Sequence, residues 1–326
     1  MNHPTPLVDV HAHFLTPRYL QEAQDAGHLR PDGMAAWPSW DAARHLELMD
    51  QWGIATSLLS ISSPGTHFGD DTAARALTRH VNETGADLKR TRPDRFGHFA
   101  SLPLPDVDAA LDELAHAMDQ LGSDGVTVEA NAHGVYLGDP RFEPLLAELD
   151  RRRTPVFVHP TSPPNQEVVS LGRPRPMLEF LFDSTRTVSD LVFNRRLQQY
   201  PDIPWIFTHG GGTLPLLTQR MELFRSVFAA ADDTPAGTEP LDRMPEQVGR
   251  LWFDIAGTPF PHQVPSLATA FGTDRLLYGS DYCFTPAEGA TAQIASVDAA
   301  AQPGQDTWRS LTTRNAHRLF PRLAAG

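Results

Sequence analysis

Short apolar runs alternate with longer segments of helical spacing along the whole chain, and this alternation constrains the fold more than any other feature. The runs cover residues Leu7–His11, Ile54–Ile61, Phe96–Ser101, Gly125–Glu129, Pro155–His159, Pro204–Thr208, Leu251–Ile255 and Arg275–Tyr278. Several are continuously apolar, which is typical of parallel strands that are covered on both faces. Eight strand–helix units predict an α/β fold, a closed (β/α)₈ barrel. An open doubly wound sheet is the alternative.

The segments between the runs carry apolar residues three and four positions apart, which indicates amphipathic helices. One helix is expected between Asp106 as N-cap and Gly122 as C-terminal stop. A second opens at Asp139-Pro140, and a third carries Leu214, Leu217, Met221, Phe224 and Phe228 on one face. Residues 14–40 are expected to form a long insertion after the first strand, and residues 231–239 a surface loop. No domain boundary is evident, so residues 1–326 are predicted to form a single domain.

Composition excludes several classes of function. The net charge of −13 disfavours a nucleic-acid partner, although a local pocket can still bind a small anion. No apolar run approaches the roughly 20 residues that span a bilayer. The single cysteine rules out an internal disulfide and a cysteine-built metal site. Because the N-terminal residues also lack the features of a signal peptide, a cytoplasmic location is expected.

Residues suited to metal binding and acid–base chemistry stand where the predicted strands end. His11 and His13 share one side of the first strand because side chains alternate along a strand. His159, His209 and Asp281 follow the fifth, sixth and eighth runs. The carboxyl ends of barrel strands form the mouth where barrel enzymes place their active sites. Histidines with a carboxylate suit zinc or a similar divalent ion, whereas a lone histidine is as readily a packing residue.

Four further residues have a functional and a structural interpretation. Arg220 lies two turns into the helix after His209 and is either a substrate ligand or a solvated surface residue. Asp254 could orient a metal-bound histidine or organise local hydrogen bonds. Phe284 is a candidate for the pocket wall, while a packing role is favoured for Cys283. The three glycines after His209 allow either close approach of a ligand or a tight turn.

Several motifs together resemble the amidohydrolase-2 branch of the amidohydrolase superfamily. They are His11-Ala-His13, Val158-His159-Pro160, Thr208-His209-Gly-Gly-Gly212, Tyr278-Gly-Ser-Asp281-Tyr and Asn315-Ala-His-Arg-Leu-Phe320. Within this branch the chain is similar to aminocarboxymuconate-semialdehyde decarboxylases and, more closely, to 6-methylsalicylate decarboxylase-like proteins. The segments Trp40–Asp50, Ile61–Gly65 and Phe180–Arg186 carry the closer resemblance, which extends over nearly the whole chain.

The resemblance implies a barrel with one catalytic metal and a shared active site. The metal ligands of the family correspond to His11, His13, His159 and Asp281, and its acid–base histidine corresponds to His209. In the related decarboxylases, the arginine that corresponds to Arg220 reaches the active site of the neighbouring subunit. A homodimer is therefore expected.

Two departures from the family pattern bear on the substrate. Cys283 replaces a proline that is common in this branch, which alters the pocket wall. The substrate-binding arginine of the muconate enzymes has no clear counterpart, because Arg18, Arg30 and Arg44 are equal candidates. This difference favours a salicylate-like substrate.

The expected activity is metal-dependent, non-oxidative decarboxylation of a small aromatic carboxylate of the o-hydroxybenzoate type, similar to 6-methylsalicylate. Asp281 or His209 is the candidate proton donor, Arg220 would bind an anionic oxygen, and Phe284 would pack on the ring. Zn²⁺ is the expected metal, with Mn²⁺ as the alternative. The alternative function is metal-dependent hydrolysis of a small amide or lactone, which the same ligands can support.

Overall fold

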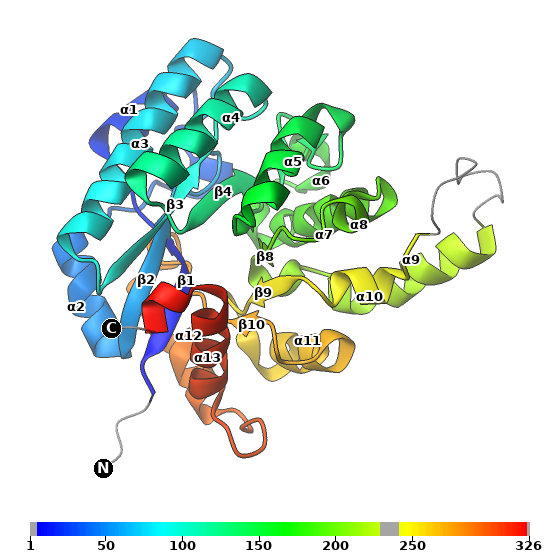
Figure 1. Cartoon of the computed structure of the whole chain (residues 1–326). Helices are drawn as coiled ribbons and strands as arrows, with labels where there is room; N and C mark the ends of the chain where they lie inside the picture. Colours follow the sequence, from blue (N-terminus) through cyan, green and yellow to red (C-terminus); the bar gives the residue numbers. More distant parts are fainter. Residues whose placement is uncertain (1–4, 229–240, 325–326) are drawn as a thin grey trace.

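The computed structural model describes residues 5–228 and 241–324 and contains an eight-stranded parallel barrel surrounded by helices (Figure 1). The strands follow one another around the barrel in chain order. They are β1 (Leu7–His13), β2 (Ile54–Ser60), β3 (Phe96–Ser101), β4 (Gly125–Glu129), β7 (Val156–His159), β8 (Trp205–Phe207), β9 (Trp252–Asp254) and β10 (Leu276–Leu277). All eight predicted strands are present, and their ends differ from the prediction by a few residues.

The barrel is closed by contacts between the first and last strands. Backbone bridges join Asp9 to Tyr278 and Ala12 to Tyr282 in parallel orientation. The Val10 N–H donates to the Tyr278 carbonyl at 2.9 Å. These contacts confirm the (β/α)₈ prediction and exclude the open doubly wound sheet.

Helices cover the outside of the barrel. They include α1 (Pro17–Asp25), α2 (Ala42–Trp52), α3 (Asp71–Thr91), α4 (Val107–His116), α5 (Glu143–Arg152), α7 (Glu179–Phe193), α9 (Leu214–Phe228), α11 (Val264–Phe271), α12 (Ala287–Ala299) and α13 (Trp308–Leu319). Shorter elements are α6 (Gln166–Val169), α8 (Arg196–Gln199), α10 (Met244–Val248), the hairpin β5 (Asn131–Ala132) and β6 (Val135–Tyr136), and the short 3₁₀- or π-helical segments η1 (Pro31–Gly33), η2 (Ala117–Leu121), η3 (Pro140–Phe142), η4 (Arg175–Met177), η5 (His209–Gly211), η6 (Pro259–Gln263) and η7 (Pro321–Ala324).

Helix α4 shows how local sequence sets helix ends. The Asp106 carboxylate accepts a hydrogen bond from the Ala109 N–H, as predicted for an N-cap. Gly122 has φ +64° and stops the helix, also as predicted. Between them the last turn widens into the π-helix η2, which spacing alone did not indicate.

The segment between β1 and α2 contains helix α1 and the turn η1. Phe14 and Tyr19 from this segment are fully buried, so it packs onto the barrel. The predicted loop at residues 231–239 lies outside the described residues, and the assignment of residues 1–326 to a single domain stays a prediction.

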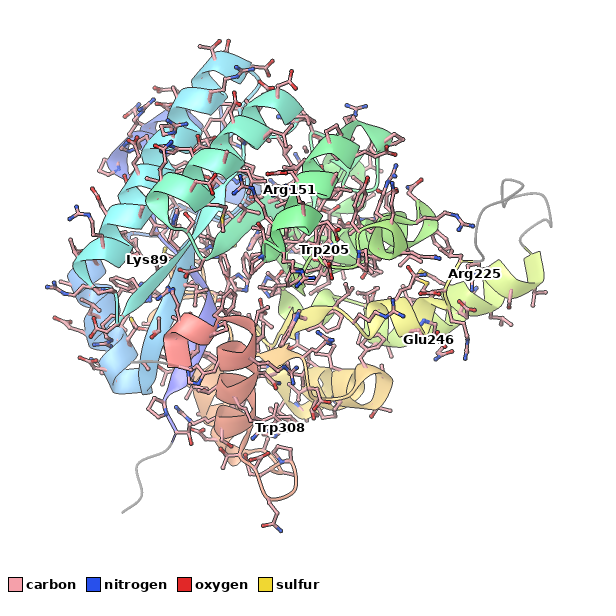
Figure 2. All side chains as sticks on the ribbon, in the orientation of Figure 1. Lys89, Arg151, Trp205, Arg225, Glu246 and Trp308 are labelled. Carbon is pink, nitrogen blue, oxygen red and sulfur yellow. The ribbon has the colours of Figure 1, made fainter. Side chains whose placement is uncertain are left out.

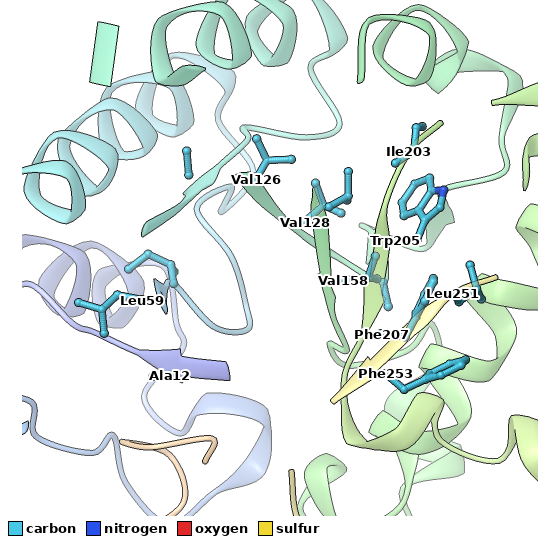
Figure 3. Close-up of a cluster of buried hydrophobic side chains, with 14 of the residues drawn as sticks. Ala12, Leu59, Val126, Val128, Val158, Ile203, Trp205, Phe207, Leu251 and Phe253 are labelled. Atoms are coloured by element: carbon cyan, nitrogen blue, oxygen red, sulfur yellow. The ribbon is translucent and has the colours of Figure 1, made fainter. Parts of the chain in front are cut away.

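The apolar core lies on both faces of the strands, and Figure 3 shows part of the larger of its two clusters. On β7, Val156 and Val158 belong to the large cluster shared with the helices, whereas Phe157 belongs to a smaller cluster in which it stacks on Phe99 at 5.3 Å. Both faces of this strand are therefore dry, which explains why its sequence does not alternate with polar residues.

Helix α9 projects beyond the rest of the barrel (Figure 1). Figure 2 shows the side chains of this projecting part around the labelled Arg225. Leu214, at its start, is fully buried. Further along, the exposed fractions are 76 % for Leu216, 56 % for Leu223 and 45 % for Phe224. The outer part of α9 therefore leaves apolar surface uncovered in the single chain. None of the described helices is long and apolar enough to cross a membrane.

Candidate metal centre and active site

Four side chains that the sequence analysis singled out meet at the mouth of the barrel. His11 and His13 stand at the end of β1, His159 ends β7, and Asp281 follows β10. Each offers one ligand atom, and these atoms lie within 4.8 Å of one another. Asp281 reaches the group from a turn with φ +58°, where its backbone N–H donates to the His11 carbonyl at 2.7 Å. The closure of the barrel thus brings residues from both ends of the chain together.

The spacing of these donors suits a metal ion. His11 Nε2 lies 3.0 Å from His13 Nε2, and Asp281 Oδ1 lies 3.4 Å and 3.3 Å from these two nitrogens. Ligands that surround a tetrahedral zinc at 2.0–2.1 Å are about 3.3 Å apart. The donor set therefore fits a single divalent ion with little rearrangement.

The other ring nitrogen of each histidine is fixed by a hydrogen bond. His11 Nδ1 faces Asp254 Oδ2 at 2.9 Å, and His159 Nδ1 faces the Pro160 carbonyl at 2.7 Å. His13 Nδ1 lies 3.1 Å from Ser60 Oγ. Such bonds hold the proton on Nδ1 and leave Nε2 free to bind a metal. The contact with His11 supports the orienting interpretation of Asp254.

Burial and neighbouring charges set the protonation of this cluster. Burial lowers the pKa of His13 and holds that of His159 well below its usual value. Burial also opposes charge on His11, but the carboxylates of Asp254 and Asp281 raise its pKa to about 10. For Asp281 burial raises the pKa, and the adjacent His11 and His13 outweigh it, so that its pKa lies well below the usual range. His13 and His159 therefore favour the neutral form that metal ligands need, whereas His11 must release a proton before its Nε2 can bind a metal.

His209 lies in the turn η5, beyond the end of β8. Its ring is centred 5.1 Å from the ring of His11 and 6.2 Å from that of His159. Burial lowers its pKa, and the carbonyl of Ala256 is a hydrogen-bond partner. A neutral imidazole in this position can exchange a proton with a bound molecule.

The glycines after His209 are required by the tight path of the chain. Gly212 has φ +67°, and a Cβ atom on it would lie 2.0 Å from the carbonyl oxygen of Leu181 in α7. Gly210 also has a positive φ and packs against the side chain of Gln263. The structure thus favours the turn interpretation of these glycines.

A cavity of about 440 Å³ opens above the cluster and has a largely apolar wall. His159, His209 and Asp281 line it together with Phe284, whose ring is centred 5.5 Å from that of His13. Met34, Met177, Phe180 and Leu181 are among the other apolar side chains that line it. Among the described residues, neither lysine nor arginine lines this cavity.

Other predicted residues lie away from the cavity. Arg220 is exposed on α9, where its guanidinium lies over the Phe224 ring at 4.8 Å. Cys283 is 4 % exposed and packs in the core, in line with the favoured packing role. Arg18, Arg30 and Arg44 are all exposed and do not line the cavity.

Three residues near the site were missed by the sequence analysis. Thr285 donates from Oγ1 to Asp281 Oδ2 at 3.1 Å and so fixes the second oxygen of that carboxylate. Gln263 lines the cavity beside His209. Glu129 ends β4 and lies 3.8 Å from His159 Nδ1. The position of Glu129 at the end of a predicted strand could have marked it as a site residue, whereas only the folded structure reveals Thr285 and Gln263.

Comparison with known proteins places the chain among enzymes of similar architecture. It is 32 % identical to decarboxylase yanB of Aspergillus niger, with 97 % of this chain and 88 % of the relative covered. It is 33 % identical to the 6-methylsalicylic acid decarboxylase acuB of Aspergillus aculeatus, over 97 % and 96 % of the two chains. A crystal structure of 2,6-dihydroxybenzoate decarboxylase with 2,6-dihydroxybenzoate has a TM-score of 0.82 at 25 % identity, covering 98 % of this chain and 100 % of that one. The amidohydrolase family model matches residues 8–322. The chain belongs to the amidohydrolase family.

Proposed function

We propose that this protein catalyses metal-dependent, non-oxidative decarboxylation of an o-hydroxybenzoate of the 6-methylsalicylate type. The observation that carries the proposal is the convergence of His11, His13, His159 and Asp281 beneath a largely apolar cavity that also contains His209. The names of the relatives, among them a 6-methylsalicylic acid decarboxylase, support the same reaction. The apolar wall suits a ring with an alkyl substituent.

In this proposal the four clustered residues hold the metal. Three imidazoles with a carboxylate suit zinc, and manganese remains the alternative. When bound, the ion supplies Lewis-acid stabilisation to the carboxylate and the adjacent hydroxyl oxygen of the substrate. The single buried Cys283 agrees with a reducing compartment, and a cytoplasmic location is part of the proposal.

The protein must deliver one proton to the ring carbon that carries the carboxylate. Loss of CO₂ without that proton would leave a localised aryl anion. After protonation, the electrons of the breaking C–C bond return to the ring, CO₂ departs and a phenol remains. His209 and Asp281 both line the cavity and are the candidate donors. Phe284 and the neighbouring apolar side chains orient the ring and exclude water.

We further propose that the active form is a homodimer in which Arg220 enters the cavity of the partner subunit. Two observations support this. The outer part of α9 exposes Leu216, Leu223 and Val227, which is surface suited to association. In the described chain, the cavity above the four clustered residues also contains no lysine or arginine for an anionic substrate. An arginine from α9 of a second copy would supply that charge by a bidentate contact.

Mass-spectrometric product analysis of the metal-reconstituted protein tests the reaction. We expect 6-methylsalicylate to give the matching phenol and CO₂, with loss of turnover after chelation. His159→Ala should abolish turnover, whereas a folded, metallated His159→Ala protein with full activity would refute the assigned site. Hydrolysis of lactones or amides without CO₂ release from any o-hydroxybenzoate would replace decarboxylation with the alternative function.

A subunit-mixing experiment tests the shared site. Arg220→Ala and His159→Ala should each be inactive alone, because each variant lacks one part of every site. If subunits exchange at random in a 1:1 mixture, half of the dimers contain both variants and one intact site, which gives about one quarter of wild-type activity. A mixture without activity, despite exchange shown by native mass spectrometry, would refute the role of Arg220 across the interface.

A further inference from the structure

A second cavity of about 370 Å³ lies beside the cavity above the cluster of His11, His13, His159 and Asp281. It is formed by the loops that follow β2, β3, β4 and β7, and we call it the β4 cavity. Asp32, on the turn η1, lines both cavities, and none of the clustered metal-binding candidates lines the β4 cavity. It is therefore a separate space that the proposed decarboxylation does not use.

Two polar side chains of β4 reach this cavity without hydrogen-bond partners. Glu129 is 16 % exposed, and neither of its oxygens has a hydrogen bond to any residue in the described ranges. The nearest cation candidate, His159 Nδ1, lies 3.8 Å away and already has the Pro160 carbonyl at 2.7 Å. Thr127, two residues earlier, is 3 % exposed, and its Oγ1 also lacks a partner. Buried polar groups are almost always paired, and each unpaired one is unfavourable because it has lost its hydrogen bonds to water.

The charges around the β4 cavity favour a positively charged ligand. Asp32, Glu129 and Glu167 line it, and Arg175 is the one lysine or arginine among the described residues that does. The Arg175 Nε–H donates to Ser162 Oγ at 2.9 Å, and this hydroxyl donates to Asp32. Arg175 is therefore held at the Asp32 side of the cavity. Burial and the carboxylates of Asp32 and Asp183 raise the pKa of Glu129 well above its usual value, so a cationic ligand beside Glu129 would favour its ionised form.

The imidazoles of the cavity do not reverse this balance. His67 pairs with Asp71 and with His133, and burial lowers the pKa of His133 and of His28. Both of these rings therefore favour the neutral form. Leu102 and Leu104 add apolar surface to the lining, so the cavity can accept a ligand with an apolar body and one charged end.

We propose that the β4 cavity binds a small organic ammonium ion, which donates hydrogen bonds to Glu129 and Thr127 while its apolar part packs on Leu102 and Leu104. Such a ligand supplies the donors that the two side chains lack and the charge that the surrounding carboxylates favour. This site goes beyond the proposed decarboxylase activity and does not depend on it.

Three probes of similar shape test the proposal by calorimetric titration into the metal-loaded protein. They are benzylamine, benzyl alcohol and benzoate, which differ in charge at one end. We expect benzylamine to bind at least tenfold more tightly than benzyl alcohol, and benzoate not to bind in this cavity. No binding of benzylamine up to 50 mM, or equal binding of the alcohol, would overturn the proposal.

Variants assign the binding to the cavity. Thr127→Val and Glu129→Gln should each weaken benzylamine binding at least tenfold, while Glu167→Gln, at an exposed acid, should change it less than threefold. Phe284 lines the cavity above the four clustered residues and does not line the β4 cavity, so Phe284→Ala should leave benzylamine binding unchanged. Because Glu129 is close to His159, metal content and thermal unfolding are measured for every variant. Unchanged affinity in folded Thr127→Val and Glu129→Gln proteins, or loss of affinity in Phe284→Ala, would refute the site.

Discussion

Replacement of Asp254 by asparagine tests how the fold prepares His11 for metal binding. Asp254 Oδ1 accepts hydrogen bonds from the backbone N–H groups of His209 and Ala256, both at 3.0 Å. Its Oδ2 faces His11 Nδ1 at 2.9 Å. In the variant, the amide oxygen must remain opposite the two backbone donors, so the amide NH₂ is turned toward His11. Two donors cannot face each other, and His11 must move its proton from Nδ1 to Nε2.

This change of tautomer places a proton on the nitrogen that faces the metal site. His11 can then bind the metal through Nε2 only after its hydrogen bond with the amide of residue 254 is broken. Loss of such an orienting partner typically weakens metal binding 10- to 100-fold. We expect Asp254→Asn to lower metal affinity in this range, or about 1.4–2.7 kcal/mol, with a parallel loss of decarboxylation at limiting metal.

Competition with a chromophoric chelator measures the metal affinity, and circular dichroism checks the fold. Asp190→Asn is the matched control, because Asp190 is a partly buried carboxylate that accepts from the Gly138 N–H at 2.7 Å and lines neither cavity. It should leave metal affinity unchanged. Wild-type affinity in Asp254→Asn would show that His11 Nε2 is not a ligand or that Asp254 does not set its tautomer.

Three predictions concern stability and can be checked by urea unfolding. Burial lowers the pKa of His98 from 6.5 in the unfolded chain to about 3 in the folded protein, so the neutral ring contributes its full stability above pH 6.5 and that stability is lost as the pH falls toward 3. At pH 5 the free energy of unfolding should be lower by about 2 kcal/mol. His98→Gln should remove this part of the pH dependence. Asp124→Asn removes a buried carboxylate that pairs with Lys89 and with the exposed Arg322, and it should destabilise the protein by about 2 kcal/mol, whereas a loss below about 0.5 kcal/mol would contradict the importance of this carboxylate. Gly212→Ala should prevent normal folding because its Cβ would lie 2.0 Å from a carbonyl oxygen of α7. Gly304 also has a positive φ, of +66°, but a Cβ built on it meets no atom within 4 Å, so Gly304→Ala should lower the free energy of unfolding by only about 1 kcal/mol. Similar losses of stability in the two variants would refute the steric argument.

The barrel strands could be predicted because both of their faces are buried, and continuous apolar runs such as Val156-Phe157-Val158 record this directly. Once the strands were predicted, the histidines at their carboxyl ends could be assigned to the site, because these ends form the mouth of the barrel. Thr285 and Gln263 could not be found in this way. Their positions depend on how the loops after β10 and β9 return over the cavity, and short polar loop residues carry no periodic signal.

Helix α9 shows another limit of sequence reasoning. The spacing of Leu214, Leu217, Met221 and Phe224 indicated a helix correctly, but it could not tell a face covered by the barrel from one left exposed. Apolar periodicity reports that a surface avoids water and does not identify what covers it. Glu129 is a related case, because a glutamate at the end of an apolar run does not reveal that it lacks a partner.

The seam between β1 and β10 has a consequence for synthesis of the protein. Translation runs from the N-terminus to the C-terminus, so His11 and His13 are synthesised roughly 270 residues before Asp281. A nascent chain therefore cannot assemble the full ligand set until the last strand has been made, and closing so long a loop is entropically costly. A metal ion bound across the seam would then act late, as a clamp on the finished barrel, and chains that end before Asp281 should retain no tight metal binding.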